Sequence, residues 1–235
     1  MSENAKIFKT AAIGALTVSE EDLKLINQYT LEPLEADDVF LFKLSVCSNA
    51  QDLDRDNEPF MLRAVKDLSK RLEGKTIILD HEPSAKNQIA RIYATQLINY
   101  NEKTEADEPL TSLEAHCYMV KTDRNADLIA EIKAGIKKEV SVGFSTSEMK
   151  CSICGKRSFT CAHLKGRIYD GKVCRDQITD CTDAYEVSFV AVPCQVNAGT
   201  VKSANSDEEN TSEDELLTRM RIRLNNNFLF TKEAE

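Results

Sequence analysis

The chain carries short apolar runs, several of them alternating with polar residues, separated by polar segments. Alternation with a period of two is typical of a strand with one buried face. The pattern predicts strands over residues 39–47, 75–79, 89–98, 111–120, 139–145 and 186–193. The last two predicted strands share a Glu-Val-Ser opening, and no longer internal repeat is present.

Apolar residues at helical spacing predict helices over residues 59–72 and 123–136. A third helix is predicted over residues 19–29, because Ser19 precedes three acidic residues and can cap the first turn. Strands and helices do not alternate regularly as they do in βαβ units. The sequence therefore favours an α+β fold with a mostly antiparallel sheet or barrel.

We expect three parts along the chain. Residues 1–38 form an N-terminal arm and helix, and residues 39–200 form the barrel domain. Residues 201–235 form an acidic linker followed by a C-terminal helix or tail, because residues 197–210 are small and acidic and residues 211–230 have leucines at helical spacing.

Charge and composition narrow the classes of function. The chain has 235 residues, a net charge of −9 and no basic stripe, which argues against nucleic acid or an anionic membrane as its main partner. It has no apolar run long enough to cross a bilayer and no signal-peptide pattern at its N-terminus, so we expect a cytosolic protein with reduced thiols. Eight cysteines in such a protein indicate metal binding or burial rather than disulfides.

A cysteine-rich insert, residues 150–182, separates the last two predicted strands. Cys151 and Cys154 are two residues apart, a spacing that lets both sulfurs bind one tetrahedral ion, and Cys161 and His163 add a third thiolate and an imidazole. Such a Cys3His set predicts a closed, structural Zn2+ site that stabilises a segment too short and polar to form a core.

The other cysteines have less defined roles. Cys174 and Cys181 remain alternative ligands within the insert. We expect Cys47, Cys117 and Cys194 to be small buried hydrophobic residues, because each lies in an apolar strand context.

The chain also contains candidates for a hydrolytic site. A serine hydroxyl becomes a nucleophile when a nearby base takes its proton, and histidine suits this role because its pKa lies near neutral pH. His163 fits the metal insert, which leaves His81 and His116 as possible bases. The candidate nucleophiles are Ser141, Ser145, Ser147 and Ser188, and the candidate carboxylates are Glu186, Asp180 and Asp183. Among the serines Ser141 is favoured, because Gly143 two residues later permits close approach of a substrate backbone.

Three motifs together resemble tailed-phage prohead proteases: the histidine in Ile77-Ile78-Leu79-Asp80-His81-Glu82, the strand Val140-Ser141-Val142-Gly143-Phe144, and the run Glu186-Val187-Ser188-Phe189-Val190-Ala191-Val192-Pro193. The resemblance covers roughly residues 39–200 and depends on the order and spacing of motifs that are individually weak. These proteases are serine peptidases whose fold is similar to herpesvirus assemblin, a β-barrel ringed by helices. The resemblance implies that Ser141 is the nucleophile, His81 the general base and Glu186 the third member of the site.

The resemblance also implies a biological role. The chain is then a serine endopeptidase of the Ser-His-Glu type that cleaves scaffold protein, the major capsid protein and itself during head maturation. It would act in the host cytoplasm, within the assembling prohead of a bacteriophage, and whether it works as a homodimer is left open. The alternative is a catalytically inactive, zinc-bearing capsid assembly or scaffold protein. The C-terminal tail is expected to dock on scaffold or capsid protein, or to be removed by autoproteolysis.

Overall fold

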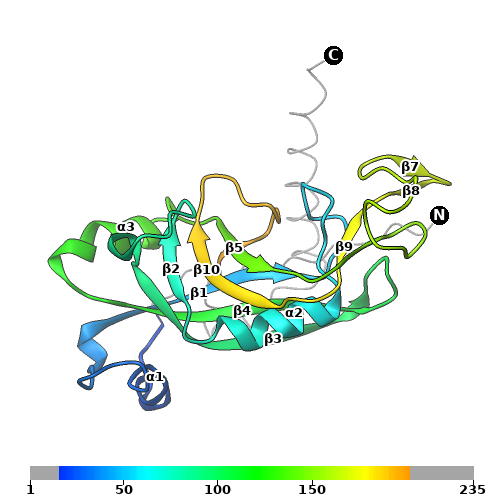
Figure 1. The fold of residues 1–235 in the computed structure, drawn as a ribbon. Helices are drawn as coiled ribbons and strands as arrows, with labels where there is room; N and C mark the ends of the chain where they lie inside the picture. Colours follow the sequence, from blue (N-terminus) through cyan, green and yellow to red (C-terminus); the bar gives the residue numbers. More distant parts are fainter. Residues whose placement is uncertain (1–15, 202–235) are drawn as a thin grey trace, which may run out of the picture. The chain divides into compact units, whose positions relative to one another are not determined.

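The computed structural model describes residues 16–201. Its main feature is a curled seven-stranded sheet (Figure 1). In spatial order its strands are β11 (Gly199–Val201), β1 (Val39–Ser48), β4 (Pro109–Val120), β3 (Ala90–Lys103), β2 (Thr76–Leu79), β10 (Asp183–Phe189) and β5 (Val140–Ser145). Every neighbouring pair is antiparallel except β2 and β10, which are parallel. The predicted α+β class and the mostly antiparallel sheet are confirmed.

The predicted barrel is only partly formed. The two end strands of the sheet, β11 and β5, do not pair along their lengths. They meet through a single bridge between Glu139 and Gly199 and through backbone hydrogen bonds from Val140 N to Ala198 O (3.2 Å) and from Thr200 N to Lys138 O (2.8 Å). The sheet is therefore curled until its ends touch at one corner, and within residues 16–201 no strand pairs with the remaining edge of β5.

Helix α2 (Leu62–Leu72) supplies much of the core on one face of the sheet. Its apolar residues recur at helical spacing, and Ala64, Val65, Leu68 and Leu72 are completely buried. They pack with strand residues that face the same side, such as Leu44, Ile77 and Leu113. Burial of one such leucine contributes about 1.5–3 kcal/mol to folding.

Helix α1 (Glu20–Ile26) covers part of the other face of the sheet. The predicted cap is present, because the Ser19 hydroxyl accepts from Asp22 N and the Asp22 carboxylate accepts from Ser19 N. Ile26 is completely buried in a second apolar cluster, and Tyr93 Oη in that cluster donates to Asp22 Oδ1 at 2.8 Å. The capped helix is thus attached directly to the sheet.

The remaining elements are short. They are helix α3 (Ala126–Lys133), the 3-10 helices η1 (Ala36–Asp38), η2 (Ala85–Asn87) and η3 (Asp123–Asn125), and the strand pairs of the insert, β6 (Met149–Cys151) with β9 (Asp176–Ile178) and β7 (Ile168–Tyr169) with β8 (Lys172–Val173). No helix in the described part of the chain is long and apolar enough to cross a membrane.

Several boundaries differ from the predictions for physical reasons. Helix α2 begins at Leu62 rather than Pro59, because residues 59–61 bond to the backbone of Ile178. Strand β10 ends at Phe189, whose carbonyl accepts the amide of Asp80. Strand β11 lies within the segment predicted to be a linker, and the predicted C-terminal helix over residues 211–230 lies outside the described residues.

We expect Leu68→Ala to lower the free energy of unfolding by about 2–5 kcal/mol, because it opens a cavity in a completely buried position. Urea unfolding followed by circular dichroism measures this loss. The matched control is Leu31→Ala, which removes the same atoms from a fully exposed side chain and should change stability by less than about 0.5 kcal/mol. Equal effects of the two substitutions would contradict the assigned core.

Candidate functional site

His81 lies in a tight turn directly after strand β2. Both Asp80 and His81 have left-handed backbone conformations, with φ of 52° and 54°. Non-glycine residues adopt this region at a cost and do so mostly where the surrounding structure enforces it. Two such residues in succession show that this turn is held by its surroundings.

Two hydrogen bonds to the neighbouring strand β10 enforce this turn. Asp80 N donates to Phe189 O at 2.9 Å, and His81 N donates to the Ser188 hydroxyl at 2.7 Å. Both acceptors lie on β10, the parallel neighbour of β2. The turn is therefore attached to the strand that carries Glu186, and the His81 ring is held above that strand.

The structure brings His81 and Glu186 together. His81 Nδ1 lies 2.8 Å from Glu186 Oε1. The histidine side chain is 43% exposed, whereas that of Glu186 is only 10% exposed. Glu186 Oε2 is buried and has no hydrogen-bond partner among the described residues. Burying a carboxylate without hydrogen bonds costs free energy. The hydrogen bond to the His81 imidazole offsets part of this cost for Glu186.

Gly143 makes room for Glu186. In the antiparallel pairing of β5 with β10, Gly143 lies directly opposite Glu186. A Cβ at Gly143 would lie only 2.3 Å from Glu186 Oε1. The sequence suggested that this glycine admits a substrate backbone, but the space above it is filled by the Glu186 carboxylate. Because Gly143 has no side chain, the Glu186 carboxylate can lie against strand β5 at this position.

Ser141 lies on the same face of the sheet as this pair. It is directly opposite Ser188, and residues opposite each other in an antiparallel pair project their side chains to one face. Glu186 and Ser188 also share a face, because they are two residues apart on one strand. No hydrogen bond joins the Ser141 hydroxyl to the His81 ring within residues 16–201, and the hydroxyl interacts with the Cys194 thiol.

The other candidate serines have structural partners. Ser188 is completely buried and accepts the His81 amide. Ser145 bonds to Tyr185 Oη, and Ser147 donates to Asp180. Ser141 is the candidate serine that lines a pocket.

The alternative base and carboxylates lie elsewhere. His116 bonds to Glu114 at 3.2 Å and stacks edge-on against Tyr93, beside the cluster that α1 covers. Asp180 accepts hydrogen bonds from Thr146 and Ser147, which close the turn after β5. Asp183 accepts the amide of Ala184 at 2.8 Å. Of the three carboxylates, Glu186 is the one that contacts a histidine.

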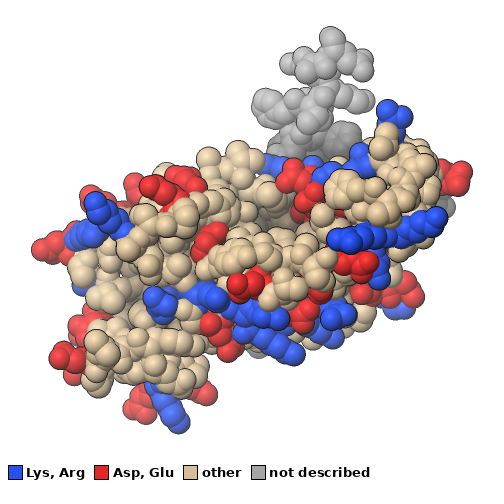
Figure 2. Space-filling view, viewed as in Figure 1, with Lys and Arg blue, Asp and Glu red and all other residues tan. Residues whose placement is uncertain are grey.

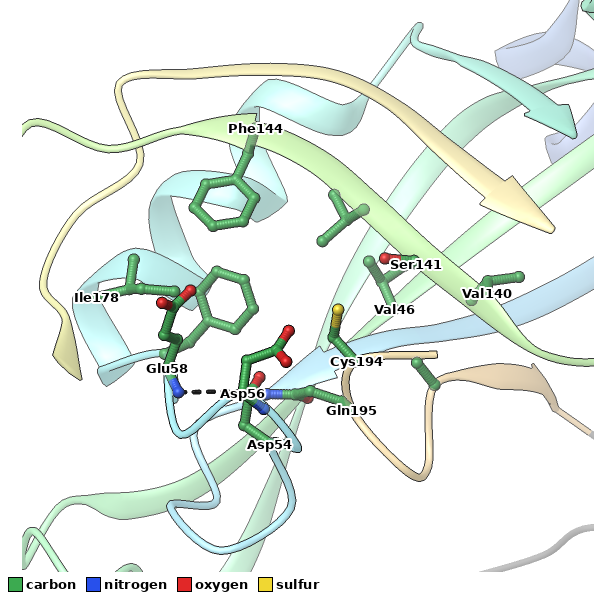
Figure 3. Close-up of a pocket in the computed structure, with 13 residues that line it drawn as sticks. Val46, Asp54, Asp56, Glu58, Val140, Ser141, Phe144, Ile178, Cys194 and Gln195 are labelled. Atoms are coloured by element: carbon green, nitrogen blue, oxygen red, sulfur yellow. Dashed lines mark hydrogen bonds between the residues drawn. The ribbon is translucent and has the colours of Figure 1, made fainter. Parts of the chain in front are cut away.

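A pocket of about 80 Å³ lies beside β5 (Figure 3). Apolar side chains form most of its wall, among them Phe60, Phe144 and Ile178, and Ser141 and Cys194 also line it. The loop after β1 adds three carboxylates, those of Asp54, Asp56 and Glu58. The sequence analysis did not identify these carboxylates as part of a site, and its prediction that Cys194 is buried is wrong, because Cys194 is exposed.

Two ionisable groups that line this pocket, Asp54 and Cys194, are partly shielded from water. Burial raises the pKa of Asp54, even though the amides of Glu58 and Asp56 donate to its Oδ1 at 3.1 Å and 3.0 Å. Burial also raises the pKa of the Cys194 thiol, and the neighbouring Asp56 carboxylate adds to the shift. The pocket therefore combines apolar walls with a polar, acidic rim.

Strand β5 presents a free edge next to this pocket. Glu139 O accepts from Val190 N, and Ser145 O accepts from Thr182 N, so odd-numbered residues of the strand direct their backbone groups toward β10 and the segments that flank it. The backbone groups of Val142 and Phe144 consequently point away from the sheet. Among the described residues they have no strand to pair with, because β5 ends the sheet. An extended peptide can add to such an edge.

The predicted metal cluster is formed in the insert. The donor atoms of Cys151, Cys154, Cys161 and His163 all lie within 4.8 Å of one another. Cys151 Sγ is 3.7 Å from His163 Nδ1. Ligands about 2.0–2.3 Å from a tetrahedral ion are about 3.4–3.8 Å apart, so the group can hold a metal ion. None of these cysteines is in a disulfide.

Cys174 is a fifth donor beside this group. Its Sγ lies 3.7 Å from Cys151 Sγ, the separation expected of two thiolates on one tetrahedral ion. Burial opposes ionisation of Cys151, but hydrogen bonds from backbone amides and from neighbouring thiols lower its pKa to about 6. Cys181, in contrast, lies in the main core and donates to Asp183 O, so it is remote from the cluster.

Comparisons with protein-family models, with curated proteins and with solved structures found no match to this chain.

We expect Gly143→Ala to displace the Glu186 carboxylate and to destabilise the fold by about 1–3 kcal/mol, because the added methyl overlaps Oε1. A double-mutant cycle with Glu186→Ala tests this cause. In the Glu186→Ala background the obstacle is gone, so the same substitution should cost clearly less. Equal costs in both backgrounds, measured by urea unfolding, would show that the carboxylate does not occupy this space.

Proposed function

We propose that the chain is a serine endopeptidase similar to phage prohead proteases, with Ser141 as nucleophile, His81 as general base and Glu186 as the group that orients the base. The observation that carries this proposal is the contact between His81 Nδ1 and the buried Glu186 carboxylate, beside the strand that bears Ser141. The proposed substrates are scaffold protein, capsid protein and the chain itself, within the assembling prohead in the host cytoplasm.

The geometry supports distinct roles for the two partners. When Nδ1–H donates to Glu186, the lone pair of Nε2 is free to accept a proton. In the proposed reaction the Ser141 hydroxyl attacks the peptide carbonyl and gives its proton to Nε2, which then passes it to the leaving amine. Glu186 stabilises the imidazolium formed in between. The Ser141 hydroxyl must turn toward His81 when a peptide binds; such bonds are often long before substrate is present.

A peptide substrate is favoured over a small molecule by the free edge of β5. The backbone groups of Val142 and Phe144 can pair with an extended chain, and the adjacent pocket can accept one of its side chains. Main-chain pairing on an edge strand places the scissile bond near the strand residue that carries the hydroxyl.

We also propose that the cysteine cluster is a structural zinc site. Thiolates and imidazole are the donors that Zn2+ prefers, and four protein ligands leave no open position for substrate. Bound zinc would stabilise the insert, and the reaction would not pass through it.

Reaction with a fluorophosphonate probe tests the nucleophile. We expect a single phosphonylated residue, Ser141, when the labelled chain is digested and sequenced by mass spectrometry, because a base-activated serine reacts with such probes. Labelling should fall at least about a hundredfold in His81→Ala. Ser145→Ala, on the same strand but bonded to Tyr185 rather than to the His81 turn, is the matched control and should keep the label. No label on a folded chain would favour the inactive assembly protein, and a label on Ser188 would contradict the assignment.

Metal analysis tests the zinc site. We expect about one equivalent of zinc per chain and a marked loss in Cys154→Ser, because a cluster that loses one of its four ligands holds the ion weakly. Cys181→Ser is the control, since this thiol lies in the core, and it should retain the metal. Loss of zinc in Cys174→Ser with retention in His163→Gln would assign the fourth ligand to Cys174 instead of His163.

A further inference from the structure

The position of the His81 ring depends on more than its contact with Glu186. A histidine ring turns about two side-chain bonds, so a hydrogen bond at Nδ1 fixes the ring only if the backbone that carries it is also fixed. On the face shown in Figure 2, acidic and basic side chains are mixed around the end of the molecule that carries β2 and α3. We therefore expect directed hydrogen bonds to the backbone of residues 79–82, rather than a patch of one charge, to decide where the ring lies.

Ser188 holds the main chain of His81 from the strand that also carries Glu186. Its hydroxyl accepts from His81 N at 2.7 Å, and the residue is completely buried. Glu186 and Ser188 are two residues apart on β10, so their side chains project to the same face. One of these side chains binds the ring of His81 and the other binds its backbone amide. The histidine is thus held at two atoms by one strand.

Ser188 also lies between the turn and the proposed nucleophile. It is paired with Ile78 of β2 on one side and with Ser141 of β5 on the other. His81 follows Ile78 by three residues, and opposite residues of antiparallel strands have Cβ atoms about 4.5–5.5 Å apart. The side chain that binds His81 N therefore neighbours Ser141, and a change at this position can alter the separation of the proposed base and nucleophile.

Asn87 holds the two ends of the same turn together. Its side-chain amide donates to Leu79 O at 2.7 Å and to Glu82 O at 3.0 Å. An NH2 group has two hydrogens and can serve both carbonyls. These carbonyls belong to the residues directly before and after Asp80 and His81, the pair with left-handed backbone conformations. Asn87 thus supplies a second set of contacts that keeps the strained turn closed.

We propose that Ser188 and Asn87 are positioning residues for His81. Ser188 sets the backbone of His81 against β10, and Asn87 keeps the turn closed. Nδ1 then stays on the Glu186 carboxylate, and Nε2 stays available to accept a proton. This role rests on the proposed function, in which His81 is the base. In that reaction neither residue touches the reacting atoms, and both act through the histidine.

The tautomer of His81 tests this role without any reaction. The chain has three histidines, so nitrogen NMR of the isotopically labelled full chain can resolve each ring, and His81→Ala identifies its signals. At a pH where the imidazole is neutral we expect the Nδ1–H tautomer, which donates to Glu186. In Ser188→Ala and in Asn87→Ala the ring should leave the carboxylate and populate both tautomers.

The rate of Ser141 phosphonylation tests the consequence for the reaction. Each variant should react with the fluorophosphonate probe roughly ten- to a hundredfold more slowly than the wild-type chain, because a displacement of about 1 Å can cost a reaction that much rate.

Two matched controls lose comparable hydrogen bonds elsewhere. Thr111→Val removes a completely buried hydroxyl that donates to Asn99 Oδ1 at 3.0 Å. Asn125→Ala removes a side-chain amide that donates to Val120 O at 2.8 Å. Both controls should keep the wild-type tautomer of the histidine and the wild-type rate of phosphonylation.

The two measurements separate this proposal from the proposed function. An unchanged tautomer, or an unchanged rate where Ser141 does react, would overturn the role of the substituted residue. Equal changes in the two controls would also overturn it, because the effect would then come from a general loss of stability. A change of tautomer in a chain whose Ser141 is never phosphonylated would support the positioning of His81 and contradict the proposed peptidase.

Discussion

The hydrogen bond between His81 Nδ1 and Glu186 Oε1 is the interaction on which the candidate site depends. The histidine occupies a left-handed backbone conformation secured by β10, and the carboxylate is buried over a strand position that tolerates no Cβ. Hydrogen bonds to β10 offset the backbone strain, and the contact with the imidazole offsets part of the cost of burying the carboxylate. Structures that retain such costs usually do so where chemistry requires them.

The curl of the sheet determines what surrounds this contact. Because the end strands meet only at one corner, most of one edge of β5 has no paired strand in the part of the chain that the structure describes, and β5 lies beside the acidic pocket. The insert is anchored to the same region by a network of polar contacts: Arg175 pairs with Glu105, Asp176 N donates to Asn57 O, and Gln177 bonds to Gln51. With a metal ion bound to its cysteine cluster, the insert can therefore orient the loop that lines the pocket without taking part in the proposed reaction.

Local patterns predicted the elements better than their ends. The Ser19 cap, the buried face of α2 and the apolar run of β1 depend on residues close in sequence, so the sequence predicted them. The start of α2 and the end of β10 depend on contacts with residues more than a hundred positions away, Ile178 and Asp80. The barrel was overpredicted, because alternation indicates strands but contains no information about closure.

The candidate sites show the same difference between features that nearby residues determine and features that distant contacts decide. The sequence by itself determined the metal-ligand group, because Cys151, Cys154, Cys161 and His163 are close along the chain and their spacing restricts them to one small volume. Only the tertiary structure decided that His81 meets Glu186, that Gly143 accommodates a carboxylate, and that Cys174 rather than Cys181 lies beside the cluster. Those contacts join residues from separate strands and loops, and their geometry follows from strand order and register, which no local pattern encodes.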